Sequence, residues 1–83
     1  MKLLYFAWLR EKIGVAGEDI ELPPNVATVG ELILWLQARG AGHAAAFADE
    51  NVVRCAVDQE FCDAEALVAG AEEIAFFPPV TGG

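Results

Sequence analysis

The residues of this chain that could do chemistry stand at its C-terminus, which ends in Gly82 and Gly83. Glycine has no Cβ, so these two residues can enter a channel that is too narrow for any other residue. A terminal carboxylate at the end of such a segment can itself serve as a reactive group. We therefore take the carboxylate of Gly83 as the candidate reactive group. The alternative is a frayed terminus without a role.

The segment before the two glycines favours an arm that enters a partner. Pro78 and Pro79 cannot continue a sheet ladder, so the preceding strand should end near Phe77. Val80 and Thr81 follow without any charge, and the two prolines stiffen the stem. We predict a folded domain over residues 1–77 and a flexible arm over residues 78–83, with a reach of roughly 20 Å.

The remaining chemically active residue types do not form a recognisable site. The chain has no serine, and His43 is its only histidine. The spacing of Cys55 and Cys62 matches no metal motif and no redox motif, so we interpret both as small, largely buried apolar residues. The sequence therefore predicts no metal site and excludes a serine nucleophile, and a reactive role of the cysteines is the alternative to their burial.

Composition restricts the class of protein. The 83 residues, of which 55% are hydrophobic, suffice for one domain with a core. A net charge of −8 argues against nucleic acid as a partner and favours a basic protein surface, although acidic surfaces also keep small proteins soluble. No apolar run is long enough to span a membrane, and the apolar start lacks a cleavage site. We expect a cytoplasmic protein that binds no membrane.

The periodicity of apolar residues predicts a mixture of strands and one main helix. Thr28 and Glu31 form a potential capping box, and the apolar residues after them recur at helical spacing until Gly40 and Gly42. A helical turn is expected over 7–13, a loop or short helix over 42–47, and a core anchor at Leu67 or Val68. Strands are expected over 2–6, 18–22, 51–57, 60–62 and 73–77, with a turn at 58–59.

Aromatic residues near the arm suggest a surface for a partner. Side chains alternate along a strand, so if Ile74 and Phe76 face the helix, Phe77 points outward. Phe61 and Phe6 could join Phe77 in an exposed aromatic cluster, which would mark a protein interface. The alternative is that loops cover these rings and that Phe77 is an ordinary core residue.

The order of elements with a terminal Gly-Gly resembles the ubiquitin-like β-grasp. The ending, AFFPPVTGG, is similar to that of the small subunits of molybdopterin synthase. Tyr5-Phe6-Ala7, the nearby Leu9-Arg10-Glu11 and the helix start Thr28-Val29-Gly30-Glu31-Leu32 resemble the same family, so the likeness covers essentially the whole chain. One departure is the segment before the last strand, where Ala69 and Ala71 stand at positions usually held by acids.

This resemblance implies an α+β fold with a mixed sheet of four to five strands and one main helix on one face. It also implies that the chain carries sulphur. A ubiquitin-activating-like enzyme would use MgATP to adenylate Gly83, and a sulphur donor would convert the adenylate into a thiocarboxylate. The arm would then enter the large synthase subunit and deliver sulphur to a cyclic pyranopterin to build the molybdopterin dithiolene. The chain itself would bind no cofactor and supply no catalytic side chain.

Three alternatives remain open from the sequence. The chain could carry sulphur for another product, such as the thiazole of thiamine or a thiolated tRNA base. It could be a ubiquitin-like modifier whose Gly83 is joined to lysines of other proteins. It could also be a plain interaction module with an inert arm.

Overall fold

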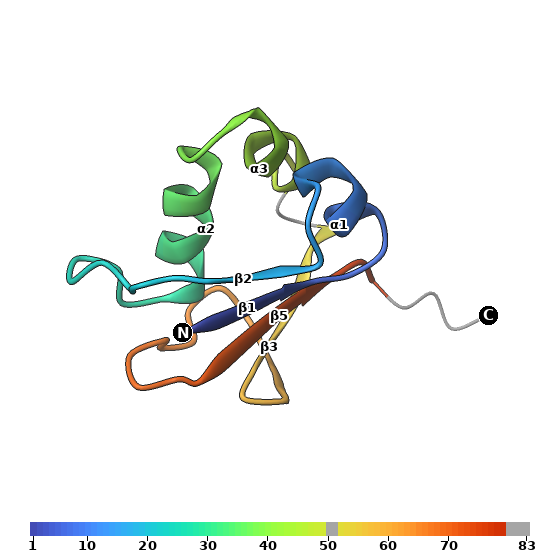
Figure 1. Cartoon of the computed structure of the whole chain (residues 1–83). Helices are drawn as coiled ribbons and strands as arrows, with labels where there is room; N and C mark the ends of the chain where they lie inside the picture. The colour runs from blue at the N-terminus through green and yellow to red at the C-terminus, as the bar shows by residue number, and fades with distance from the viewer. Residues whose placement is uncertain (50–51, 80–83) are drawn as a thin grey trace.

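A computed structural model describes residues 1–49 and 52–79 of the chain. In this part of the chain a single sheet of five strands carries three helices over one of its faces (Figure 1). In chain order the elements are β1 (Lys2–Tyr5), α1 (Trp8–Ile13), β2 (Gly17–Asp19), α2 (Val29–Gln37), α3 (Ala41–Ala46), β3 (Arg54–Val57), β4 (Glu60–Cys62) and β5 (Glu73–Phe77). None of the helices in the described ranges is long and apolar enough to cross a membrane.

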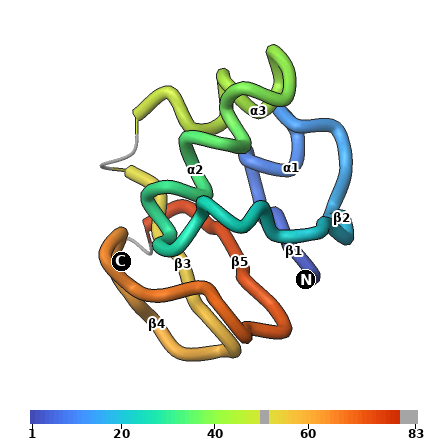
Figure 2. The backbone as a smooth tube through the Cα atoms, turned by 90° about the vertical axis from the view of Figure 1, so that its left-hand side faces the viewer, coloured from blue at the N-terminus to red at the C-terminus, as the bar shows by residue number. Residues whose placement is uncertain are grey.

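The strands lie in the order β2-β1-β5-β3-β4. β5 runs parallel to β1 and antiparallel to β3, while the outer pairs, β1 with β2 and β3 with β4, are antiparallel (Figure 2). The strand that leads into the C-terminal segment is therefore the middle strand of the sheet, hydrogen-bonded on both edges. This arrangement confirms the predicted mixed sheet with a main helix on one face, and two six-residue helices, α1 and α3, accompany that helix.

The main helix, α2, begins as the sequence predicts. The backbone N–H of Glu31 donates to the Thr28 hydroxyl, and the backbone N–H of Thr28 donates to the Glu31 carboxylate, so the capping box is complete. The apolar residues at helical spacing are all buried, namely Val29, Leu32, Ile33 and Leu36. The stripe read from the sequence is thus the face that packs toward the sheet.

Alternation along the central strands sets the other half of the core. Tyr5 of β1 and Phe76 of β5 are fully buried, and their rings stack with centroids 6.2 Å apart. Phe47, which follows α3, meets Phe76 edge-on at 5.0 Å. Ile74 is also fully buried, which confirms that Ile74 and Phe76 face the helices. Val68 rather than Leu67 is the anchor of its segment, because Leu67 is 71% exposed.

Several boundaries differ from the prediction, and among them β3 begins at Arg54 rather than at residue 51. β2 ends at Asp19 rather than near residue 22, and the next residue, Ile20, exchanges two backbone hydrogen bonds with Met1, which precedes β1. Gly42 does not terminate α2, which ends at Gln37, but lies inside α3. A Cβ at Gly42 would lie 2.6 Å from the carbonyl oxygen of Lys12, so this glycine lets α3 approach α1 closely.

The segment that departs from the resemblance is held by an acid from elsewhere in the chain. The Asp58 carboxylate accepts hydrogen bonds from the backbone N–H groups of Glu72 and Glu73, at 2.9 and 3.0 Å. Asp58 belongs to the hairpin turn between β3 and β4, where both Asp58 and Gln59 have positive φ. These hydrogen bonds therefore link the β3–β4 turn to the segment that leads into β5, at one end of the sheet.

Candidate functional site

The candidate arm begins at the middle of the sheet. β5 ends at Phe77, and Pro78 and Pro79 follow outside any strand, as their missing N–H groups and fixed φ require. The candidate reactive residue Gly83 and the preceding Val80, Thr81 and Gly82 lie outside the described residues. What the structure describes is the surface from which this segment departs.

An aromatic pair, Phe61 and Phe77, stands beside that point of departure. The ring centroids are 5.7 Å apart, although the two residues come from β4 and β5, which are not neighbours in the sheet. Phe61 is 84% exposed and Phe77 is half-buried. Together with Arg54 of β3, which lies opposite Phe77, the pair borders a hollow of about 190 Å³.

The third predicted aromatic residue, Phe6, lies on the other side of β5. It follows β1 directly, its backbone N–H donates to the carbonyl of Phe76 at 3.1 Å, and its side chain is 48% exposed. The ring pairs among the described residues do not include Phe6 with either member of the aromatic pair. The structure therefore brings Phe61 and Phe77 together and leaves Phe6 across the strand from them.

The face of the sheet away from the helices, called here the open face, extends between Phe6 and the aromatic pair. Its centre is apolar, because Ala56 of β3 lies opposite Ala75 of β5, and Ala75 lies opposite Leu4 of β1. The sequence analysis missed this floor of Leu4, Ala56 and Ala75. The signal was available, since each lies one residue away from a buried side chain on the same strand.

This surface is suited to binding rather than to acid–base chemistry. Large apolar rings beside a flat apolar floor form the kind of patch that serves as the desolvated centre of a protein interface. Exposed acids such as Glu60 and Asp63 stand on the same outer strand or just after it. A partner with an apolar centre and a basic rim fits this arrangement and the net charge of −8.

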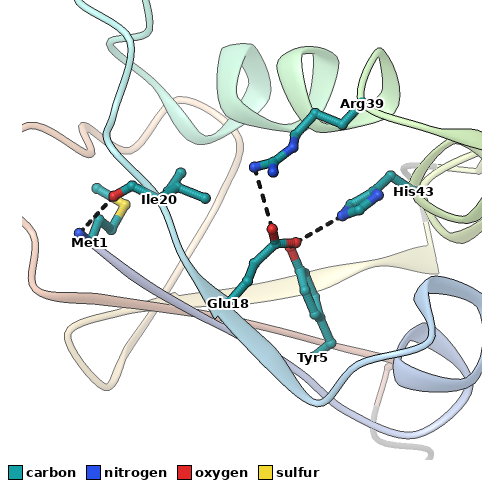
Figure 3. Close-up of polar contacts among 6 residues, drawn as sticks. All are labelled: Met1, Tyr5, Glu18, Ile20, Arg39 and His43. Carbon is teal, nitrogen blue, oxygen red and sulfur yellow. Dashed lines mark hydrogen bonds and ion pairs between the residues drawn. The ribbon is translucent and has the colours of Figure 1, made fainter.

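A polar cluster on the helix side was also missed by the sequence analysis. The Glu18 carboxylate accepts hydrogen bonds from the Tyr5 hydroxyl and from His43 Nε2, both at 2.8 Å, and Arg39 Nη1 lies 3.3 Å from its other oxygen (Figure 3). These residues come from β1, β2, the α2–α3 connection and α3. The cluster therefore ties the outer strand β2 to the helical layer.

The cluster shifts the pKa values of two of its members. Burial by itself would raise the pKa of Glu18, but the hydrogen bonds from His43 and Tyr5 and the charge of Arg39 lower that pKa below its ordinary value. Burial, and then the bond to Glu18, raise the pKa of Tyr5. Three side chains, those of Tyr5, Arg39 and His43, point to the Glu18 carboxylate, which supports a structural role for the cluster.

Comparisons with known proteins agree with the resemblance noted above. The molybdopterin synthase sulfur carrier subunit of Haemophilus influenzae is 37% identical over 83 residues, covering 100% of this chain and 99% of the relative. The protein of the same name from Escherichia coli strain K12 is 34% identical over 83 residues, with the same coverage.

Solved structures share the fold. A putative molybdopterin converting factor subunit 1 from Pyrococcus furiosus superposes with a TM-score of 0.75 at 31% identity, covering 95% of both chains. The small archaeal modifier protein 1 of Haloferax volcanii superposes with a TM-score of 0.71 at 28% identity, covering 96% of this chain and 97% of the other. The architecture is the ubiquitin-like β-grasp. The model of the ThiS family matches residues 3–83, and the chain belongs to that family.

Proposed function

We propose that this chain is the sulphur carrier subunit of a molybdopterin synthase. The observation that carries the proposal is the similarity, over the full length of the chain, to proteins of that name from two bacteria. The aromatic pair next to the first residues of the arm supports it, because a carrier must bind its partner close to the segment that it delivers.

The proposed chemistry takes place at the carboxylate of Gly83. A carboxylate is a poor electrophile, so an activating enzyme of the ubiquitin-activating type would use MgATP to form an acyl adenylate and release pyrophosphate. A sulphur donor would then displace AMP and leave a thiocarboxylate. The large synthase subunit would receive the arm, and the sulphur would pass to a cyclic pyranopterin. Two deliveries would complete the dithiolene.

The chain's own contribution is positioning. Docking of the open face and the aromatic pair on the large subunit would hold the arm at a high effective concentration in the active site of that subunit. Because β5 is the middle strand, the arm would start from a fixed point of the sheet. Catalytic side chains, MgATP and the pterin would all belong to the partners, and we expect the reaction to take place in the cytoplasm.

Intact mass spectrometry tests the proposal. The protein is incubated with MgATP, the matching activating enzyme and a sulphur source, and the mass should rise by the difference between sulphur and oxygen on the peptide that ends in Gly83. A chain lacking Gly83 but with an unchanged circular dichroism spectrum is the control and should remain unmodified. Failure to gain sulphur, with the activating enzyme competent on another carrier, would refute the carrier function.

A second candidate function is supported by the structural similarity to a small archaeal modifier protein. In that case Gly83 would be joined through an isopeptide bond to lysines of other proteins. Expression of a tagged chain, followed by denaturing capture, would reveal conjugates of higher mass that disappear when Gly83 is removed. If no such conjugates form and cofactor synthesis still depends on Gly83, the modifier function would be ruled out and the carrier function would be supported.

A further inference from the structure

The two cysteines of the chain meet across the β3–β4 hairpin. Cys55 of β3 and Cys62 of β4 are direct cross-strand partners, and their Sγ atoms lie 3.0 Å apart. Directly opposed residues in an antiparallel pair have Cα atoms about 4.5–5.5 Å apart, which lies within the range of about 4.4–6.8 Å that a disulfide spans. Both thiols are free in the structure.

We propose that Cys55 and Cys62 form a dithiol site that is oxidised reversibly by low-molecular-weight disulfides to an intramolecular disulfide. This site is separate from the C-terminal chemistry proposed above and does not depend on it. It is a modification site between β3 and the outer strand β4 (Figure 2).

Access to the pair is provided from the side of α2. Cys55 and Cys62 line a cavity of about 400 Å³ between the start of α2 and the outer strands, together with Val29, Ile33, Asp63 and Ala64 among others. Cys55 is buried, whereas Cys62 is half-buried. Burial, together with the neighbouring Cys62 thiol, raises the pKa of the Cys55 thiol to about 12. Cys62 is therefore the thiol that a reagent meets first.

The reaction follows in two exchange steps. The Cys62 thiolate attacks one sulphur of the small disulfide, forming a mixed disulfide and releasing one small thiolate. Cys55 then loses its proton and attacks the Cys62 sulphur, 3.0 Å away, which releases the second small thiolate. The protein dithiol loses two electrons, the small disulfide gains them, and both thiol protons end on the two released thiols.

The hairpin explains why a disulfide would be tolerated here. The two-residue turn at Asp58 and Gln59, with both φ values positive, matches the twist of the flanking strands and fixes the register that brings the cysteines together. β4 has three residues and, among the strands that the structure describes, pairs with β3 alone. A covalent bond across this pair would hold the outer strand in place with little movement of the backbone.

The test uses the full-length reduced chain with excess oxidised glutathione under native conditions. The expected product has lost the mass of two hydrogens, carries no glutathione, and yields one peptide pair linked through Cys55 and Cys62 on digestion without reductant. Dithiothreitol should restore the original mass. The unfolding midpoint of the oxidised chain should rise by at least about 5 °C, because the closed loop restricts the unfolded state.

Two single variants check the order of the steps. Cys55→Ala should accumulate one stable glutathione adduct at Cys62, and Cys62→Ala should react at least roughly 10-fold more slowly because the remaining thiol is buried. The proposal is overturned if the reduced chain keeps two glutathione adducts, forms disulfides only between chains, or remains a dithiol while a denatured sample reacts. The wild-type measurement decides this even if a variant does not fold.

Discussion

At the scale of single residues, the aromatic pair has the properties of a binding anchor. Phe61 exposes 84% of its surface and contributes little to the core, yet it is held next to Phe77, whose strand leads into the arm. An exposed ring that is kept in a defined position loses little entropy when a partner covers it. Its role is therefore testable apart from folding.

Phe61→Ala should weaken binding to the large synthase subunit by about 1–3 kcal/mol and leave the free energy of unfolding nearly unchanged. Leu34→Ala is the matched control, because Leu34 is 62% exposed but lies on α2, on the side of the sheet opposite the open face. Calorimetric titration of each variant measures the effect. Equal losses for both variants, or a loss of stability for Phe61→Ala alone, would contradict an anchoring role.

Glu18 gives a second prediction at this scale. Glu18→Gln should lower the free energy of unfolding by about 1–3 kcal/mol at neutral pH, because the charged acceptor for His43, Tyr5 and Arg39 is lost. The folded-state pKa of Glu18 is lowered, so its contribution is present at neutral pH and is lost as the pH falls through that pKa.

Urea unfolding at about pH 7 and about pH 3 measures this effect, and the two proteins should differ less in acid. Glu21→Gln removes an equal charge from an exposed position nearby and serves as the control. A difference between wild type and Glu18→Gln that is the same at both pH values would show that the carboxylate charge is not what stabilises the cluster.

At the scale of elements, the two short helices α1 and α3 depend on close packing against each other for their stability. α1 and α3 have six residues each, which is too few for an isolated helix to be stable in water. They are stabilised by each other, and Gly42 allows the contact because a Cβ there would collide with the backbone of Lys12.

Gly42→Ala should therefore destabilise the protein by about 1–3 kcal/mol, although alanine is normally the better helix former. Gly30→Ala in α2 is the comparison, since its Cβ would meet the Ala64 carbonyl oxygen only at 3.3 Å, and its cost should be smaller. Thermal unfolding of both variants shows which substitution destabilises the protein more. If Gly42→Ala were more stable than the wild type, α1 and α3 could move apart without loss of stability, and the close contact at Gly42 would not be required.

The elements also show what the sequence could predict. The capped helix and the buried alternation of β5 follow from local rules that need only neighbours in the chain, and both were correct. The end of β2 and the role of Gly42 depend on partners from distant segments, Met1 and Lys12, and local patterns carry no information about these.

The candidate site shows the same difference between features set by neighbours in the chain, which the sequence predicts, and features set by distant segments, which it does not. The outward position of Phe77 follows from alternation, and the β3–β4 hairpin places Phe61 on the outer strand. The contact between the two rings also depends on the pairing of β3 with β5, just as the position of Phe6 depends on the parallel register of β1 with β5, and neither pairing is local in the sequence. The cysteine pair was missed, although a two-residue turn at 58–59 implies that residue 55 lies opposite residue 62. The burial predicted for the cysteines holds for Cys55, but their spacing alone, without the hairpin, does not reveal that they are in contact.

At the scale of the whole molecule, charge should govern how quickly the partner is found. The chain carries 13 acidic and 5 basic residues. Long-range attraction to a basic surface raises the association rate and is screened by salt. The association rate constant with the large subunit should fall at least roughly 10-fold between about 0.05 and 0.5 M salt.

Stopped-flow measurements at several salt concentrations check this prediction. Phe61→Ala should show the same salt dependence as the wild type, because the ring acts after encounter and changes mainly the dissociation rate. An association rate that does not vary with salt would mean that the acidic surface serves only solubility.

The position of β5 has a mechanical consequence. It lies between β1 and β3, and it runs parallel to the strand that begins at Lys2. A force applied between the chain start and the segment after Phe77 would load the β1–β5 hydrogen bonds in shear, so that they must break together rather than one after another. Pulling in this direction would therefore meet the resistance of all the β1–β5 hydrogen bonds at once.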